Sequence, residues 1–272
     1  MPSIPEGDVL IHAGDCTGSG TLPQIHEFAR WMGTQPHAYK ILVAGNHDFC
    51  FDRKLRGSTM SVWARELCEQ NGITYLRGES VSIRGINFFG FPWQPIFRHM
   101  AFNAREAELR GRLKLVPDDT HVLISHGPAY GILDFVPNEG RHVGCQSLAK
   151  RIEQLPNLMA HICGHIHEGY GILQREAGGL NFVNGSICRK GVAPVNQILS
   201  IRFAERPKLC AQLLELLETR GVSNERRIDG VLAYIDINSP VRAIITVIRH
   251  QIFHQPPFPQ SPLLINHDIC HS

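Results

Sequence analysis

The sequence lacks several features that would assign it to a common functional class. No segment approaches the roughly 18 to 20 uninterrupted apolar residues of a membrane span, and residues 1–8 carry neither a cationic segment nor an apolar signal core. The formal net charge is only +2, without a basic block of the kind that marks a nucleic-acid or membrane surface. These absences predict a soluble, cytoplasmic protein with no nucleic-acid surface and no membrane partner.

The sequence also lacks any C-x-x-C pair, so the usual thiolate zinc modules are not supported. Its 8 cysteines are scattered singly through a chain that is 43% hydrophobic, which favours reduced thiols in a large core over a disulfide framework. Histidine, in contrast, is abundant. Several of the 15 histidines stand beside Gly, Asn or Asp where strands are predicted to end.

Four short apolar runs, at 8–13, 40–44, 121–124 and 158–163, read as buried strands, and a polar loop follows each of them. Helix-period stretches at 24–32, 61–71 and 146–155 favour crossover helices of a layered α/β fold. Such folds place ligand sites at the carboxyl ends of their strands. The loops contain, in chain order, Gly14 and Asp15; Gly45, Asn46, His47 and Asp48; Ser125, His126 and Gly127; and Gly164, His165, Ile166 and His167.

Further strands are predicted at 80–84 and 86–91, as a hairpin, and at 180–185 and 197–203, as closing strands. The character of the sequence changes after about residue 205, where an amphipathic stretch, a short apolar run at 241–250 and a Pro-rich break follow one another. The sequence therefore predicts a main domain at 1–204 and a C-terminal extension at 205–272 that is helical or partly disordered.

The four loops offer the donor atoms that phosphate-ester hydrolysis requires. Two metal ions close together make a nucleophile from water and neutralise charge on the phosphoryl oxygens. Asp15 follows a glycine at a strand end and has two oxygens to share between ions. Asn46 can offer a carbonyl oxygen, whereas the imidazoles of His126, His165 and His167 suit Mn, Fe, Zn and similar divalent transition ions. The i, i+2 spacing of the last two histidines lets them address separate metals.

His47 is adjacent to Asn46, so its side chain is displaced toward the substrate if Asn46 reaches a metal. We therefore expect His47 to donate a proton to the leaving group, with Asp48 orienting its imidazole. Taken singly, a Gly-Asp pair or a Gly-Asn-His-Asp segment is an ordinary turn. The ordered combination of four such loops after four apolar strands favours a metal site.

This ordered set of loops resembles that of the calcineurin-like metallophosphoesterases. The loop at 91–95 (Phe-Pro-Trp-Gln-Pro), the Ser-His-Gly-Pro at 125–128 and the segment 164–171 are further similar to the metallophosphoesterase-domain-containing, or brain protein 239, group. The resemblance covers residues 7–203 and implies a four-layer αββα metallophosphoesterase sandwich. It also implies a role for each residue: Asp15 bridges two ions, His167 binds the first, His47 contacts the scissile phosphate, and Asn46, His126 and His165 bind the second.

The family's first motif, a strand ending in Asp-x-His ahead of the Gly-Asp loop, has no counterpart in this chain, which starts close before the run at 8–13. We therefore expect an N-terminally truncated sandwich whose first metal keeps only Asp15 and His167, a site that would be weak or empty. The neighbours of the absent strand would have unpaired backbone groups unless another segment substitutes. Three explanations are open: an incomplete or misassigned start, a natural short form that lacks activity, or a protein that works with one metal.

The expected function is that of a metal-dependent phosphodiesterase. The group resembled acts on cyclic nucleotides and other phosphodiesters, so a small phosphodiester or nucleotide is the expected substrate, hydrolysed by metal-activated water with His47 assisting the leaving group. The alternative is a non-catalytic phosphate- or nucleotide-binding module, because the first metal site is incomplete; a third reading is an unstable fragment. The sequence leaves the native metal, the exact substrate and the oligomeric state open.

Overall fold

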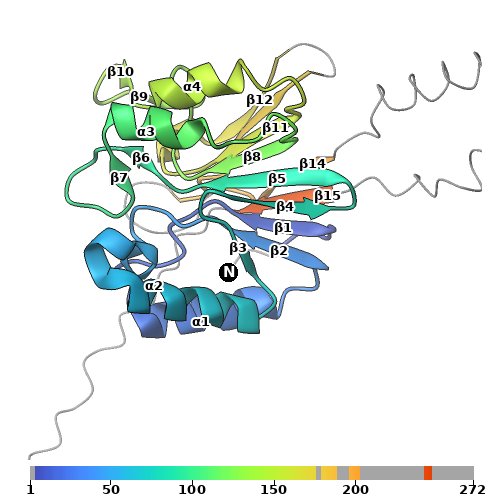
Figure 1. The fold of residues 1–272 in the computed structure, drawn as a ribbon. Helices are drawn as coiled ribbons and strands as arrows, with labels where there is room; N and C mark the ends of the chain where they lie inside the picture. Colours follow the sequence, from blue (N-terminus) through green and yellow to red (C-terminus); the bar gives the residue numbers. More distant parts are fainter. Residues whose placement is uncertain (1–3, 176–178, 189–195, 203–241, 247–272) are drawn as a thin grey trace, which may run out of the picture.

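The computed structural model describes residues 4–175, 179–188, 196–202 and 242–246. Two β-sheets lie face to face in these residues (Figure 1). Helices α1 (Leu22–Gly33) and α2 (Arg53–Gln70) cover the outer face of one sheet, and helices α3 (Glu106–Leu113) and α4 (Gln146–Ile152) cover the outer face of the other. The four-layer αββα sandwich predicted from the sequence is therefore confirmed.

The first sheet has the strand order β14-β15-β1-β2-β3. Strands β15, β1, β2 and β3 run parallel to one another, and β14 pairs antiparallel with β15. The elements of this half are β1 (Val9–His12), α1 (Leu22–Gly33), β2 (Tyr39–Leu42), η1 (Phe49–Phe51), α2 (Arg53–Gln70), β3 (Thr74–Tyr75), β14 (Leu199–Arg202) and β15 (Arg242–Thr246).

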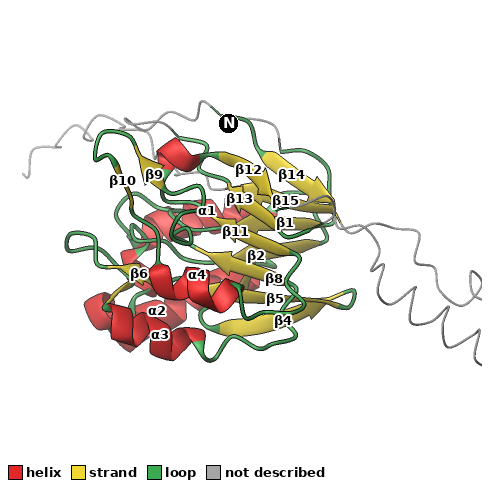
Figure 2. Cartoon of the chain, turned by 90° about the horizontal axis from the view of Figure 1, so that it is seen from above, coloured by secondary structure: helices red, strands yellow, loops and turns green. Residues whose placement is uncertain are grey.

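The second sheet has the order β12-β13-β11-β8-β5-β4, with its four inner strands parallel and its two edge strands antiparallel to their neighbours. Short segments that connect the strands of the second sheet extend beyond one end of the sheets, where β6, β9 and β10 lie in Figure 2. The elements are β4 (Glu79–Ile83), β5 (Ile86–Phe91), β6 (Gln94–Pro95), β7 (Asn103–Ala104), α3 (Glu106–Leu113), β8 (Val122–Ser125), β9 (Phe135–Val136), β10 (Arg141–His142), α4 (Gln146–Ile152), β11 (Ala160–Cys163), η2 (His167–Gly169), β12 (Gly171–Gln174) and β13 (Asn181–Asn184).

Strand β1 is buried on both faces, which explains its continuous apolar sequence. Val9 and Ile11 belong to the core between the two sheets, whereas Leu10 belongs to the core between sheet and helices. In that second core Leu10 is joined by Phe28 and Met32 of α1, and none of the three is exposed to solvent. Burial of each such side chain contributes about 1.5–3 kcal/mol, so the packing on both faces fixes the position of the strand end.

Helix α1 forms because its apolar residues recur at helical spacing. Ile25, Phe28, Ala29 and Met32 face the core. The side chain of Gln24 accepts a hydrogen bond from the Thr21 backbone N–H at 3.4 Å, and this contact satisfies one donor at the start of the helix. The helix therefore begins and ends where its apolar periodicity does, and the predicted stretch at 24–32 is confirmed.

The remaining predicted elements are confirmed with two differences. The predicted hairpin is the antiparallel pair β4 and β5, and the predicted strands at 180–185 and 197–203 are β13 and β14. Helix α2, however, begins at Arg53 rather than near residue 61, with Gly57 in a non-helical conformation inside it. Helix α3 was not predicted, because only Leu109 and Leu113 of its residues are buried and the apolar pattern is too sparse to recognise.

The C-terminal extension contributes a strand to the first sheet. Residues 242–246, which lie in the apolar run noted at 241–250, form β15 rather than a helical or disordered segment, and the rest of 205–272 lies outside the described residues. β15 pairs in parallel with β1 from Val9↔Ala243 to His12↔Thr246, on the side opposite β2. The backbone of β1 thus has a partner on both sides. The predicted domain boundary at residue 204 stays a prediction.

Within the described residues, no helix combines the length and the apolar character that a membrane crossing requires. Six cysteines in the same residues are free and buried, as the sequence predicted for reduced thiols: Cys16, Cys50, Cys68, Cys145, Cys163 and Cys188. Cys210 and Cys270 lie outside the described residues.

Removal of β15 should destabilise the sandwich. A chain ending at residue 241 lacks the strand, whereas a chain ending at residue 246 retains it and serves as the matched control. Each buried backbone group of β1 left without a partner costs about 1–3 kcal/mol, so we expect the shorter chain to unfold at a temperature lower by about 10 °C or more in thermal denaturation. Equal midpoints for the two chains would show that β15 contributes no stability.

Candidate metal centre

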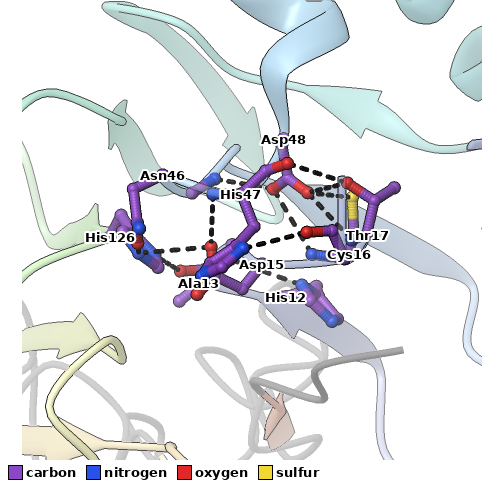
Figure 3. Close-up of polar contacts among 12 residues, drawn as sticks. His12, Ala13, Asp15, Cys16, Thr17, Asn46, His47, Asp48 and His126 are labelled. Atoms are coloured by element: carbon purple, nitrogen blue, oxygen red, sulfur yellow. Dashed lines mark hydrogen bonds and ion pairs between the residues drawn. The ribbon is translucent and has the colours of Figure 1, made fainter. Parts of the chain in front are cut away.

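Four loops that follow parallel strands meet at one end of the two sheets. Asp15 and Asn46 follow β1 and β2 of the first sheet, while His126 and His165 follow β8 and β11 of the second. The carboxyl ends of parallel strands lie at the same edge of a sheet, which is where open α/β folds bind ligands. Asp15, Asn46 and His126 lie together in Figure 3. The loops predicted to carry the site are therefore brought together from both sheets.

Three of the predicted ligands form one compact group. Asp15, His126 and His165 each offer a ligand atom, and these atoms all lie within 4.8 Å of one another. The ring centroids of His126 and His165 are 4.9 Å apart. Asn46 lies beside this group, because its Oδ1 is 2.8 Å from Nε2 of His126. These are the four residues expected on the second ion.

The protonation state of His126 determines whether a cation can lie among these groups. Its Nδ1 lies 2.9 Å from the carbonyl oxygen of Ala13, which can only accept, so Nδ1 carries the proton. Burial lowers the pKa of His126 to about 4, and the ring is therefore neutral near pH 7. Its Nε2 then presents a lone pair, which faces Oδ1 of Asn46 at 2.8 Å and Oδ1 of Asp15 at 3.5 Å.

Lone pairs that face one another at these distances repel unless a cation lies among them. His165 contributes a further neutral imidazole to this group, because burial lowers its pKa to about 3. A carboxylate, an amide oxygen and two neutral imidazoles form a donor set that suits divalent transition ions. The residues present therefore fit the metal that the sequence implies.

His167 lies at the edge of this group. It opens the 3₁₀ turn η2 and is not among the three residues whose ligand atoms converge. It is nevertheless near enough that its charge lowers the pKa values of His126 and His165. The expectation that His165 and His167 address separate ions remains a prediction that this arrangement allows.

His47 is held by its backbone and by one ring nitrogen. Its backbone N–H donates to Oδ1 of Asp15 at 2.9 Å, and its Nδ1 lies 2.9 Å from the carbonyl oxygen of Gly18. Because that carbonyl only accepts, Nδ1 donates the proton. The imidazole is thus oriented by the loop that follows Asp15, beside the convergent ligands.

The expectation that Asp48 orients the His47 imidazole needs correction, since Gly18 makes that contact. The buried Asp48 carboxylate accepts hydrogen bonds from the backbone of Cys16, Thr17 and Gly45 and from the hydroxyl of Thr17, at 2.7–3.3 Å. It joins the loop after β1 to the loop after β2 (Figure 3). Burial and the nearby charge of Asp15 raise the pKa of Asp48, and these hydrogen bonds oppose the rise.

Two glycines allow the loops to approach this closely. A Cβ atom on Gly45 would lie 2.3 Å from the backbone nitrogen of Asp15 and 2.6 Å from Cε1 of His126. A Cβ on Gly14, whose φ is 101°, would lie 2.4 Å from Nδ1 of His126. No side chain fits at either position, so the glycine before Asp15 and the one before Asn46 are required by the packing of the site.

The backbone is also strained at two of the ligands. Asp15 and His165 have φ values of 57° and 68°, in the left-handed region that non-glycine residues rarely occupy. Each such residue costs about 1–3 kcal/mol and persists only where the surroundings enforce it. Strain at two convergent ligands is typical of a functional site.

One supporting residue was missed in the sequence. His161 lies in the fourth apolar run and was not among the predicted site residues. Its Nε2 lies 2.8 Å from Oγ of Ser125, which donates to the carbonyl oxygen of Gly127 at 2.6 Å. This buried chain of hydrogen bonds braces the loop that carries His126. Its only sequence signal is a histidine inside an apolar strand, a pattern that does not reveal which neighbour it contacts.

The sandwich and the donor set of this site define a phosphoesterase of the metal-dependent α/β class. Residues 2–169 match the family model described as calcineurin-like phosphoesterase. The chain belongs to this family, and the resemblance drawn from its four loops is confirmed.

Relatives support the narrower group as well. Over 209 residues the chain is 37% identical to the metallophosphoesterase domain-containing protein 1 of Homo sapiens, an alignment that covers 71% of this chain and 64% of that protein. It is 37% identical over 195 residues to a UPF0046 protein of Caenorhabditis elegans, covering 70% of this chain and 66% of the relative. The chain thus spans less than two thirds of the length of these relatives. A phosphopantetheinyl hydrolase from Mycobacterium tuberculosis is 17% identical, with a TM-score of 0.45 over 66% of this chain and 79% of that one.

Substitution of Gly45 by alanine should abolish metal binding. The added methyl group would overlap the backbone of Asp15, so the loop must move and the ligand atoms must separate. Gly111→Ala is the matched control, because it lies in α3 with open space around its Cβ position. We expect G45A to bind Mn²⁺ at least about 100-fold more weakly than the wild type by calorimetry, as a misplaced ligand costs several kcal/mol, and G111A to bind it normally. Unchanged affinity in G45A would refute the close packing described for this loop.

Proposed function

We propose that this chain is a phosphodiesterase that hydrolyses small phosphodiesters with the help of bound metal ions. One observation carries the proposal: oxygens of Asp15 and Asn46 face the unprotonated Nε2 of His126. In a calcineurin-like phosphoesterase, such a cluster of lone pairs supports a cation that receives a phosphate ester.

We assign the second ion to Asp15, Asn46, His126 and His165, and the first ion to Asp15 and His167. Mn, Fe, Zn or a similar divalent transition ion suits these ligands. When bound, the ions would supply positive charge for the phosphoryl oxygens and acidify the attacking water. Support for the first ion is the position of His167 two residues after His165, near enough to influence the pKa values of His126 and His165.

His47 is the residue that we assign to proton transfer. Its Nδ1 donates to the carbonyl oxygen of Gly18, so a general acid at this position requires the imidazolium form, with a second proton on Nε2. That Nε2 proton would go to the oxygen of the leaving group and leave a neutral ring with its proton on Nδ1. Its backbone bond to Asp15 fixes the residue beside the convergent ligands without using the imidazole. This arrangement supports a catalytic role distinct from metal binding.

Cyclic nucleotides are the substrate class that we propose first. Support comes from the absence of a basic block in the sequence, which favours a small substrate over a nucleic acid. We also propose that the protein works in the cytoplasm and without a membrane partner. Fractionation of cells that express the tagged chain tests the location.

A phosphate- or nucleotide-binding module without turnover is the second candidate. It is favoured by the finding that the ligand atoms of acidic, histidine and cysteine side chains converge in a single group within the described part of the chain. One such group holds one ion, which is sufficient to bind a phosphate. It provides less charge neutralisation than a pair of ions does.

Replacement of His47 by alanine should remove turnover while metal binding persists. Bis(p-nitrophenyl) phosphate and the 2′,3′- and 3′,5′-cyclic nucleotides are assayed with Mn²⁺. Loss of a general acid lowers kcat by about 10²–10⁴-fold, and we expect a decrease in that range for H47A. His26→Ala is the control, because His26 is an exposed histidine of α1. Equal kcat values for the wild type and H47A would reject the assignment.

The metal content of the purified chain separates the two candidates. We expect close to two Mn²⁺ per chain by elemental analysis after equilibration, falling to one in His167→Ala and to less than one in His165→Ala. The difference arises because His165 is a member of the convergent group and His167 is not. One ion per wild-type chain together with no turnover would favour the binding module instead.

A further inference from the structure

The β6–β7 loop, which includes both short strands and spans residues 94–104, touches three of the four loops that carry the assigned metal ligands. The backbone N–H of Ala101 donates to the carbonyl oxygen of Asn46 at 3.0 Å. The side chain of Gln94 lies against Gly127, where a Cβ atom would be 3.7 Å from the Cβ of Gln94. The ring of Phe97 meets that of His165 edge to face, with centroids 5.7 Å apart. This loop therefore forms one wall of the candidate site.

The loop is held in a single shape by its own side chains. Oδ1 of Asn103 accepts from the N–H of Phe97 at 3.1 Å, and its Nδ2 donates to the carbonyl oxygens of Phe97 and Arg98 at 3.1 and 3.0 Å. At its far end, the N–H of Phe102 donates to the buried carboxylate of Asp52 at 2.7 Å. Phe97 is thus positioned before any ligand arrives, which lowers the entropy lost on binding.

Phe97 is exposed although it stands on a fixed loop. Its side chain has 41% of its surface accessible, even with the guanidinium of Arg98 at 5.1 Å from its ring centroid. An aromatic ring that is held in place, touches a metal ligand and remains open to solvent is suited to pack against a planar ligand. The nearby cation of Arg98 favours a ligand that is also anionic.

Gln94 gives a second reason to expect a ligand on this side. Its side chain is 1% exposed, and neither its Oε1 nor its Nε2 has a hydrogen-bond partner among the described residues. A buried amide without partners destabilises the fold, because its polar groups have lost their hydrogen bonds to water and gained none in exchange. It lies at the base of the same loop, beside the residue that follows His126. A polar group of a bound ligand would supply the hydrogen-bond partner that this amide lacks.

We propose that the ring of Phe97 forms the subsite that binds the planar organic group of the substrate, a nucleobase or an aryl ring. This rests on the proposed function, because the metal ions hold the phosphate next to it. A rival position exists at β9 and β10, where the exposed Phe135 of β9 and the exposed Tyr130, in the segment before it, flank His142. Phe97 is favoured because its ring contacts His165 itself, whereas the rings of the rival group contact His142.

Binding rather than turnover tests the subsite. Affinities for adenosine 5′-monophosphate and for ribose 5-phosphate, which lacks the base, are measured by calorimetry on the Mn²⁺-loaded full chain. Stacking of a base on an aromatic ring contributes about 1–3 kcal/mol, so we expect Phe97→Leu to weaken the nucleotide about 5- to 20-fold. Its affinity for ribose 5-phosphate should stay within about twofold, because leucine removes the flat face and leaves the phosphate ligands in place.

Tyr130→Leu is the matched control, since Tyr130 is 44% exposed and belongs to the rival group. We expect it to bind both ligands as the wild type does, and the metal content and unfolding temperature of both variants to remain unchanged. The proposal is overturned if F97L binds the nucleotide as well as the wild type does, if the wild type binds both ligands equally, or if Y130L alone loses the nucleotide. A wild-type chain that binds the nucleotide through Phe97 without hydrolysing any phosphodiester would reject the proposed function and leave the subsite standing.

Discussion

The hydrogen bond between Nδ1 of His126 and the carbonyl oxygen of Ala13 is the interaction on which the site depends. It joins the loop after β8, in the second sheet, to the loop after β1, in the first. It also fixes the tautomer of the imidazole, so that Nε2 faces the oxygens of Asn46 and Asp15. This bond therefore joins the two sheets at the end where the site lies, and it sets which nitrogen of His126 faces the other ligands.

The surrounding residues make this bond possible. Gly14 and Gly45 leave the space in which the His126 ring lies, since a methyl group on either would overlap it. The carboxylate of Asp48 holds the loops after β1 and β2 at a constant separation through the backbone of Thr17 and Gly45. Backbone packing and buried hydrogen bonds thus hold the convergent side chains in place without a bound ion.

Much of this could be predicted because the pattern is local. A short apolar run followed by a polar loop identifies a buried strand and the residues at its end, and this was sufficient for Asp15, Asn46, His126 and His165. The features that could not be predicted depend on contacts between residues that are distant in sequence. The role of Asp48 is decided by which loop packs beside it, and the partner of His161 by the register of β8 and β11. Likewise, nothing in the sequence at 242–246 indicates that it pairs with β1.

The arrangement of the ligands has an energetic consequence for the whole fold. Acceptor atoms of Asp15, Asn46 and His126 are held face to face. In addition, Asp15 and His165 occupy strained backbone conformations that cost about 1–3 kcal/mol each. An ion that binds only the folded chain would offset this, contributing about 2.7 kcal/mol when its concentration is a hundredfold above Kd. Because the ligands come from both sheets, the ion would also resist their separation. Binding of such an ion would therefore be coupled to the packing of the two sheets, and each would strengthen the other.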